Sequence, residues 1–215
     1  MRVETGYLDG LGPVNGIDTS KWNGTPTGET PSWLKYYGMK ALDVKYDPIV
    51  DEQFNVTRER VHHVRWKGMY IYVRPEAEFG VSIREQIHLL SVAVERLVSG
   101  EFVFLDIEEA ELTALDVDTA LHWATTLFPG RVGLYLNDNT PEFARWWKER
   151  WSQWRGSVPI IYPQYNEHGF WEANAKHAAI WQVGVGINPG THRPKVEVPY
   201  DLVLDWDALD AVCDL

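Results

Sequence analysis

The sequence has little cysteine, little positive charge and no long apolar run, and each shortage excludes a class of protein. A single cysteine, Cys213, in 215 residues excludes an internal disulfide and leaves the redox compartment undecided. No apolar run approaches the ~18–20 residues that a membrane-spanning helix requires, and the opening MRVETGYLDG lacks the apolar core of a signal peptide. Lys and Arg number 20 against 31 Asp and Glu, for a formal net charge of −11. This charge argues against nucleic acid as a partner and against adhesion to anionic surfaces such as a membrane.

The sequence is instead rich in apolar and aromatic side chains. Hydrophobic residues make up 45% of the 215 positions, and Trp alone accounts for 11. This length gives one domain, or a small α/β barrel, with ample material for a core. We expect an N-terminal arm over residues 1–13 and a single domain over residues 14–215. The Trp excess can fill a core, and it also suits stacking on sugar rings.

Acidic side chains follow abruptly on an apolar run in EFVFLDIEEA, residues 101–110. The run Phe102–Leu105 predicts a strand buried on both faces, as in a parallel sheet. Because side chains two apart in a strand share a face, Asp106 and Glu108 should project together, and their repulsion should raise at least one pKa. A general acid at neutral pH needs such a raised pKa. The alternative is a solvated strand-to-loop junction that is acidic without a catalytic role.

Apolar runs and amphipathic segments alternate along the chain, which predicts an α/β fold. Helical segments are expected at residues 33–38 (one or two turns), 51–67, 82–97, 116–128 and 141–154. Strands are expected at residues 14–17, 39–44, 69–73, 102–105, 131–136, 158–165, 178–183 and 202–205. The pattern is five strand–helix units followed by three strands, a modified TIM-like barrel written (β/α)5(β)3. Acidic residues at the carboxyl ends of its strands place the site on one rim.

Two further features have simple structural explanations. Asp18 ends the first expected strand, in VNGIDTSKWNG, where an aspartate also caps turns. His62 and His63 fall on one expected helix, where adjacent side chains diverge by about 100° and so cannot chelate one metal ion. We therefore expect no metal site and no cofactor.

Six short motifs follow one another along the chain. They are GIDTSKWNG (16–24), FLDIEE (104–109), GLYLN (133–137), PIIYPQY (159–165), IWQVGVG (180–186) and VLDWDAL (203–209). In this order they resemble the motifs of glycoside hydrolase family 25, the Chalaropsis-type lysozymes (muramidases) that are common in phage endolysins. The resemblance covers roughly residues 14–210.

The resemblance implies the same barrel and cleavage of the β-1,4 bond between N-acetylmuramic acid and N-acetylglucosamine in peptidoglycan. By position, Glu108 would be the general acid, and Asp106 would orient the 2-acetamido group of the sugar or act on the anomeric carbon. Asp18 and Asp205 would complete an acidic cleft on the same rim. Side chains implied at the sugar sites are Lys45, Tyr72, Arg74, Tyr135, Tyr165, Trp181 and Gln182.

The sequence departs from the family pattern on this rim. After the second strand it reads KYDPIVDE, where the family usually has Lys-Ala-Thr-Glu-Gly. The third strand reads MYIYVRP, which brings Arg74 into a region that normally lacks it, and Asp207 replaces the Asn of the closing motif. These changes bear on substrate detail rather than on the fold.

Two other functions stay open. A non-catalytic glycan-binding or virion structural domain could use the same barrel, although the retention of four acids speaks against it. A chitinase-like barrel glycosidase is the second, but family 18 uses Asp-x-x-Asp-x-Asp-x-Glu, and FVFLDIEE has only the last two acids. We therefore expect a monomeric, phage-encoded lysin, an endolysin or a virion-associated enzyme, made in the host cytoplasm and acting on the cell wall.

Overall fold

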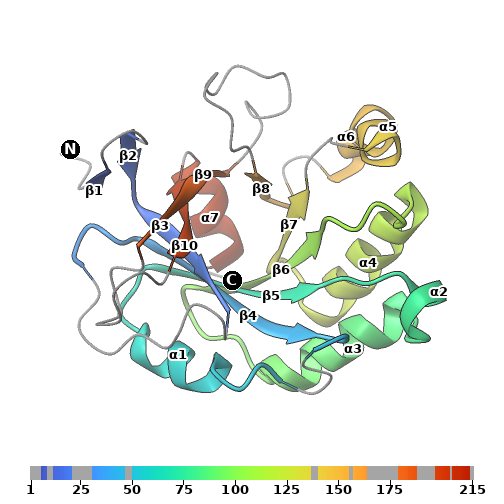
Figure 1. Ribbon diagram of the computed structural model, residues 1–215, viewed down its shortest axis with the longest axis horizontal. Helices are drawn as coiled ribbons and strands as arrows, with labels where there is room; N and C mark the ends of the chain where they lie inside the picture. The colour runs from blue at the N-terminus through green and yellow to red at the C-terminus, as the bar shows by residue number, and fades with distance from the viewer. Residues whose placement is uncertain are drawn as a thin grey trace.

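Eight strands close into a barrel (Figure 1). The computed structural model describes residues 6–8, 12–20, 31–46, 50–136, 140–154, 157–163, 179–187, 197–203 and 205–213. Around the barrel, the strands are β10 (Glu197–Val203), β3 (Gly16–Thr19), β4 (Tyr36–Asp43), β5 (Trp66–Tyr72), β6 (Glu101–Ile107), β7 (Val132–Leu136), β8 (Ile160–Pro163) and β9 (Ile180–Ile187). The expected α/β class is confirmed.

The last strand differs in direction from the others. From β3 round to β9, every pair of adjacent strands is parallel. Strand β10 closes the barrel and is antiparallel to both β3 and β9. The carboxyl end of β10 therefore points to the opposite end of the barrel from those of the parallel strands. The expectation that all the strands deliver their carboxyl ends to one rim is wrong for this strand.

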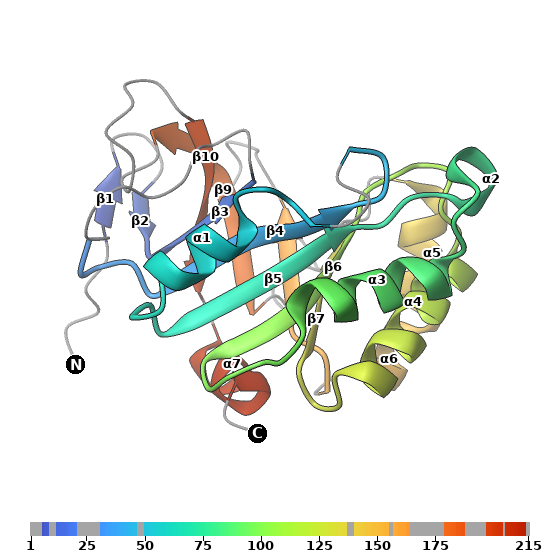
Figure 2. The same ribbon diagram turned by 90° about the horizontal axis from the view of Figure 1, so that it is seen from below.

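Helices cover the outside of β4 to β7 (Figures 1 and 2). They are α1 (Phe54–Arg60) after β4, α2 (Glu76–Phe79) and α3 (Ile83–Val94) after β5, α4 (Ala114–Leu127) after β6, and α5 (Pro141–Glu149) and α6 (Trp151–Trp154) after β7. Residues 21–30 after β3 and 164–178 after β8 lie outside the described residues. The count of five strand–helix units therefore stays a prediction.

Short-range signals set where these helices begin. The Ser82 hydroxyl accepts a hydrogen bond from the Glu85 N–H (3.2 Å), as expected for the start of α3. In α4 the cap is Thr113, which forms a reciprocal capping box with Asp116, so this helix begins two residues before the expected start. Thr140 caps α5, and Pro141 follows at the first helical position, where its missing N–H costs nothing.

Strand β6 separates two cores, and all seven of its residues are buried. Its outward side chains Val103, Leu105 and Ile107 join the core between the strands and the helices. Its inward side chains Phe102 and Phe104 belong to a second core that fills the barrel and includes Tyr36 and Trp66. Because side chains alternate along a strand, the inward row continues beyond Phe104 to Asp106 and Glu108.

Several segments differ from the expected elements. The helix expected over residues 51–67 ends at Arg60, and Trp66 already begins β5. Tyr36–Gly38 belongs to β4 rather than to a helical turn, because both tyrosines are fully buried on opposite faces of the sheet. The chain after β10 forms α7 (Trp206–Cys213), which lies across one end of the barrel (Figure 2). The N-terminal segment contains an antiparallel pair, β1 (Gly6–Leu8) and β2 (Gly12–Val14).

Candidate active site

Acidic side chains from β3 and β6 meet at the carboxyl end of the parallel strands. A cavity of about 240 Å³ opens there, lined by Asp18, Ser20, Lys40, Tyr70, Tyr72, Phe104, Asp106, Glu108, Tyr135 and Gln182. The strand register explains this convergence, because Asp106 lies opposite Tyr72 on β5 and opposite Tyr135 on β7. The cavity thereby brings together six residues expected from the sequence, namely Asp18, Tyr72, Asp106, Glu108, Tyr135 and Gln182.

Asp106 and Glu108 form an acid pair joined by a side-chain hydrogen bond. Asp106 is 8% exposed, and its buried Oδ1 atom has no hydrogen-bond partner among the described residues. Burial and the charges of Glu108 and Asp18 raise the pKa of Asp106 well above its usual range. Burial also raises the pKa of Glu108, although hydrogen bonds with Asp106 and Tyr135 oppose this. Both charged forms are therefore disfavoured, more strongly for Asp106 than for Glu108, because the hydrogen bond between the two side chains raises the pKa of Asp106 and lowers that of Glu108.

Asp18 reaches the same cavity from β3 and depends on a glycine opposite it. A Cβ atom at Gly38 would lie 1.4 Å from Asp18 Oδ1, so only glycine leaves room for this carboxyl group. The Tyr36 hydroxyl donates to Asp18 Oδ1 (3.1 Å), and the Gln182 amide donates to Oδ2 (3.0 Å). The Tyr135 hydroxyl in turn donates to Gln182 Oε1 (2.8 Å), so a chain of hydrogen bonds fixes Asp18 across the barrel.

The fourth acid near the site is Asp201, not Asp205. Asp201 lies opposite Gly16 in the β10–β3 pairing, so it shares the inner face with Asp18, which is two residues further along β3. It is fully buried, and burial together with the Asp18 charge raises its pKa well above the usual range, with Gln182 offsetting only part of the increase.

Asp205 is exposed and follows the carboxyl end of β10. Its Oδ1 atom accepts a hydrogen bond from the Ala208 N–H (2.9 Å) in the first turn of α7, as a helix-capping aspartate does. The antiparallel direction of β10 therefore places this residue at the end of the barrel opposite the cavity. The expectation that Asp205 shares the acidic rim is wrong.

Two expected cationic side chains lie outside the cavity lining. Lys45 is exposed, with its ammonium group 5.0 Å from the Tyr46 ring centroid and 5.8 Å from that of Phe79. Arg74 is buried behind the cavity wall and binds Asp43 and Glu109. The lysine that does line the cavity is Lys40, which sequence reasoning missed although it shares the inner face of β4 with Tyr36.

The tryptophans after β7 are buried, which agrees with a packing role, whereas Tyr135 is only 6% exposed and the expectation that it is partly exposed in the cleft is wrong. Trp146, Trp147 and Trp151 are buried packing residues of α5 and α6, at 0%, 7% and 8% exposure, and Trp154 packs against the same core. Tyr165 and the side chain of Trp181 lie outside the described residues, so their places at the sugar sites stay predictions. His62 and His63 are exposed and lie in the turn after α1, not on a helix as expected.

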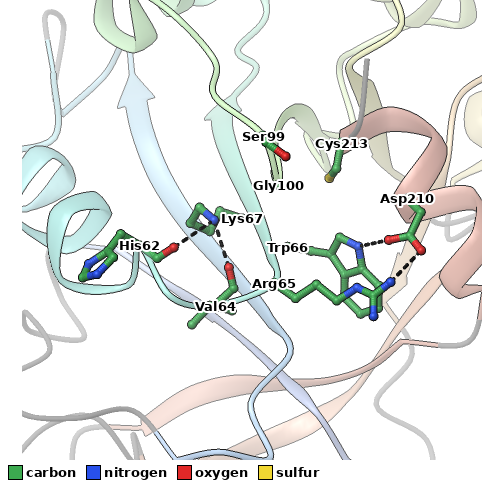
Figure 3. Close-up of a pocket in the computed structure, with 9 residues that line it drawn as sticks. All are labelled: His62, Val64, Arg65, Trp66, Lys67, Ser99, Gly100, Asp210 and Cys213. Carbon is green, nitrogen blue, oxygen red and sulfur yellow. Dashed lines mark hydrogen bonds and ion pairs between the residues drawn. The ribbon is translucent and has the colours of Figure 1, made fainter.

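A second cavity, of about 300 Å³, lies at the opposite end of the barrel beside α7 (Figure 3). Its polar groups pair with one another. Asp210 accepts hydrogen bonds from Trp66 Nε1 (2.9 Å) and Arg65 Nη2 (2.7 Å), and the buried Lys67 ammonium donates to the Val64 carbonyl (2.9 Å). These contacts hold α7 against the base of the barrel, far from the acid pair.

The described part of the chain shows two absences. No three His, Cys, Asp or Glu side chains within it are grouped so as to hold a metal ion. Among the helices of this part, none is long and apolar enough to cross a membrane.

Several solved structures share this fold. A lysozyme from Streptomyces coelicolor matches over 94% of this chain and 97% of its own, with a TM-score of 0.66 and 18% identity. The catalytic domain of endolysin ply40, from bacteriophage P40 of Listeria monocytogenes, matches over 93% and 97%, with a TM-score of 0.61 and 16% identity. The CTP1L endolysin matches over 88% of this chain and 66% of its own, with a TM-score of 0.51 and 14% identity. No protein-family model and no curated protein sequence matches the chain.

The burial of Asp18 predicts how stability depends on pH. Burial and the Glu108 charge raise its pKa from 3.8 to about 7, so Asp18 ionises at lower pH in the unfolded chain than in the folded one. The contribution of Asp18 to the free energy of unfolding should therefore be greatest below about pH 4 and should fall, by on the order of 4 kcal/mol, as the pH rises from about 4 to about 7.

Urea unfolding from pH 4 to pH 8 measures this fall directly. In Asp18→Asn the fall should be smaller than in the wild type, because the substituted side chain does not titrate. Asp205→Asn is the matched control, since it removes an exposed carboxylate from the other end of the barrel and should leave the pH dependence unchanged. An Asp18→Asn variant with the wild-type pH dependence would contradict the assigned ionisation.

Proposed function

We propose that the protein is a peptidoglycan hydrolase, an N-acetylmuramidase similar to those of glycoside hydrolase family 25. It would cleave the β-1,4 bond between N-acetylmuramic acid and N-acetylglucosamine. The observation that carries the proposal is the acid pair Asp106 and Glu108. Both side chains project from the end of a buried strand into the cavity, and the pKa of each is raised. Glycoside hydrolysis through an oxocarbenium-like transition state needs one protonated and one ionised carboxyl group.

Glu108 fits the role of the general acid. Its side chain lines the cavity and is more exposed than that of Asp106, so it is the member of the pair that a glycosidic oxygen can approach. Burial raises its pKa, which favours the protonated form that a general acid needs. Transfer of this proton to the leaving oxygen breaks the glycosidic bond without releasing an unstable alkoxide.

Asp106 fits the role of the partner carboxylate. Its carboxyl group lines the cavity and can accept a hydrogen bond from the N–H of a 2-acetamido group, which orients that group toward the anomeric carbon. The carboxylate can alternatively attack the anomeric carbon itself. Either role requires the ionised form of Asp106 once Glu108 carries the proton.

The rest of the cavity suits a polar polymer built of sugar rings. Phe104, Tyr70 and Tyr72 form an aromatic wall, in which the Phe104 and Tyr70 rings stack 4.8 Å apart. Lys40 brings a positive charge into a cavity that otherwise carries acids, and Asp18 with the deeper Asp201 adds a negative field around the reacting centre. Such a field stabilises the positive charge that develops on the sugar.

The shared fold supports a role in cell-wall lysis. The neighbours in fold include a bacterial lysozyme and two endolysins. In keeping with these neighbours, we propose that the chain forms a (β/α)5(β)3 barrel and acts on the bacterial cell wall as a monomeric, phage-encoded lysin.

Digestion of purified peptidoglycan tests the reaction class. The wild-type protein should solubilise the polymer and release new reducing ends, without releasing new amino groups. New amino groups without reducing ends would show cleavage of the peptide or amide bonds and would refute a glycosidase. Binding to the polymer with no release of fragments would instead favour a glycan-binding domain.

A further inference from the structure

Arg74 joins the ends of three neighbouring strands just behind the cavity. It follows β5, and its guanidinium donates to both carboxylate oxygens of Asp43 at the end of β4, through Nε (3.2 Å) and Nη2 (3.0 Å). Nη1 donates to Glu109, which comes after the end of β6 and directly follows Glu108. The guanidinium carbon lies 4.0 Å from the ring centroid of Tyr72, which lines the cavity.

The backbone of Arg74 is fixed as firmly as its side chain. The Gln86 side chain of α3 accepts from the Arg74 N–H (2.9 Å) and donates to its carbonyl oxygen (2.7 Å). Gln86 is fully buried, and Arg74 is only 7% exposed. A guanidinium held at both ends in this way offers a rigid site for a carboxylate.

We propose that Arg74 is a positioning residue for the acid pair. Arg74 binds the Glu109 carboxylate and so neutralises the negative charge next to Glu108 in the chain. This inference rests on the proposed function, in which Glu108 delivers the proton. Two adjacent carboxylates after one strand would otherwise add a third negative charge to a cavity that already holds Asp106 and Asp18. That charge would raise the pKa of Glu108, so Glu108 would release its proton less readily.

The groups around Glu108 agree with this arrangement. Burial raises its pKa, hydrogen bonds with Asp106 and Tyr135 lower it, the charge of Glu109 raises it, and the charge of Arg74 lowers it. The titratable and charged groups that face Glu108 or share its cavity are Asp18 on β3, Lys40 on β4, Tyr70 and Tyr72 on β5, Asp106 on β6, Tyr135 on β7, Arg74 and Glu109. Lys40 and Arg74 are the two cations of this set, and Arg74 is the one that binds Glu109.

A carbon-13 NMR titration of the Glu108 carboxyl group tests the proposal without any need for activity. The signal is assigned by its loss in Glu108→Gln, and its midpoint is followed in Arg74→Met, Glu109→Gln and the double variant. Arg74→Met should raise the midpoint by several tenths of a pH unit or more, because the cation is lost and the Glu109 charge is left unneutralised. Glu109→Gln should lower it. The double variant should lie close to the wild type.

Two matched controls and one conservative change separate positioning from general effects. Arg84→Met and Glu111→Gln change the net charge by the same amounts at exposed positions and should leave the midpoint unchanged. Arg74→Lys keeps the charge but loses the two-pronged contact with Asp43, so its midpoint should shift less than that of Arg74→Met. Arg74→Met also leaves Asp43 buried without this partner, so circular dichroism must first show that the variant is folded.

Each result of these titrations either supports or overturns the role of Arg74. If Arg74→Met does not fold, Glu109→Gln and Arg74→Lys carry the test, and an unmoved midpoint in Glu109→Gln overturns the proposal. The proposal is also overturned if Arg74→Met shifts the Glu108 midpoint and the added Glu109→Gln substitution does not cancel the shift. Arg74 would then act on Glu108 without Glu109. In active protein, the alkaline limb of kcat/KM should move with the midpoint. A wild type that never cleaves peptidoglycan refutes the proposed function but leaves the titration intact.

Discussion

Glu108→Gln is expected to lower the rate of peptidoglycan hydrolysis by a factor on the order of 10²–10⁴, which general acid catalysis typically contributes. The substitution keeps the volume of the side chain and removes its transferable proton. It also removes a charge that disfavours ionisation of Asp106, so the variant should be at least as stable as the wild type near neutral pH. The rate of release of reducing ends, with thermal unfolding measured on the same sample, gives both quantities.

The control for this change is Glu111→Gln, an exposed glutamate three residues further along the chain. It should keep wild-type activity, since its side chain does not line the cavity. A Glu108→Gln variant that turns over at nearly the wild-type rate would remove Glu108 from the role of the acid.

Asp106→Asn should be the second most damaging change, with a loss on the order of at least 10² in kcat. Asparagine keeps the shape of the side chain but cannot carry the negative charge that stabilises an oxocarbenium-like centre or directs an acetamido group onto it. Binding should suffer less than turnover, because the aromatic wall and Lys40 are untouched. Steady-state kinetics on soluble peptidoglycan fragments separate the two quantities.

Asp205→Asn is the matched comparison for this second change. Both are substitutions of an aspartate by asparagine, yet Asp205 only caps the first turn of α7 at the far end of the barrel. Because asparagine is itself a good capping residue, activity and stability should remain close to the wild type. A loss of activity in Asp205→Asn as large as that in Asp106→Asn would contradict the assignment of the acids to the two ends.

The acid pair could be predicted because local rules determine its placement. The apolar run before Asp106 fixes β6 as a buried strand, and the alternation of side chains fixes which of its acids face inward. The Phe102 and Phe104 side chains fill the barrel on the same face. Neither inference needs any knowledge of the partner strands.

The position of Asp201 could not be predicted in this way because it depends on strand direction. The apolar segment Leu202–Leu204 has an aspartate on each side, and the local pattern is the same for either direction of the chain. Only the long-range antiparallel pairing of β10 with β3 and β9 decides that Asp201 faces the inner core and Asp205 the helix. Asp205 was chosen through the match of VLDWDAL to the closing motif of the family, and the assumption of parallel strands then placed it on the acidic rim.

Lys40 was missed because residues 33–38 were expected to be helical, so the alternation from Tyr36 along β4 was not applied. The β4–β5 pairing then changes register between Lys40 and Leu42, and such a bulge re-aims the side chains that follow it. Lys45, which the family comparison favours, lies past this irregularity and is exposed. The contacts of Arg74 were also beyond sequence reasoning, since its partners Asp43, Gln86 and Glu109 come from three different segments of the chain.

The identity of the sugar at the newly formed reducing ends tests the proposed reaction most directly. Purified peptidoglycan is digested, the products are reduced with borohydride, and the end residue is identified by mass spectrometry after acid hydrolysis. Cleavage of the bond between N-acetylmuramic acid and N-acetylglucosamine leaves N-acetylmuramic acid at the new reducing end, so the reduced residue should be muramitol. Glucosaminitol as the only reduced residue would show cleavage of the other glycosidic bond and would contradict the assignment of the protein as a muramidase.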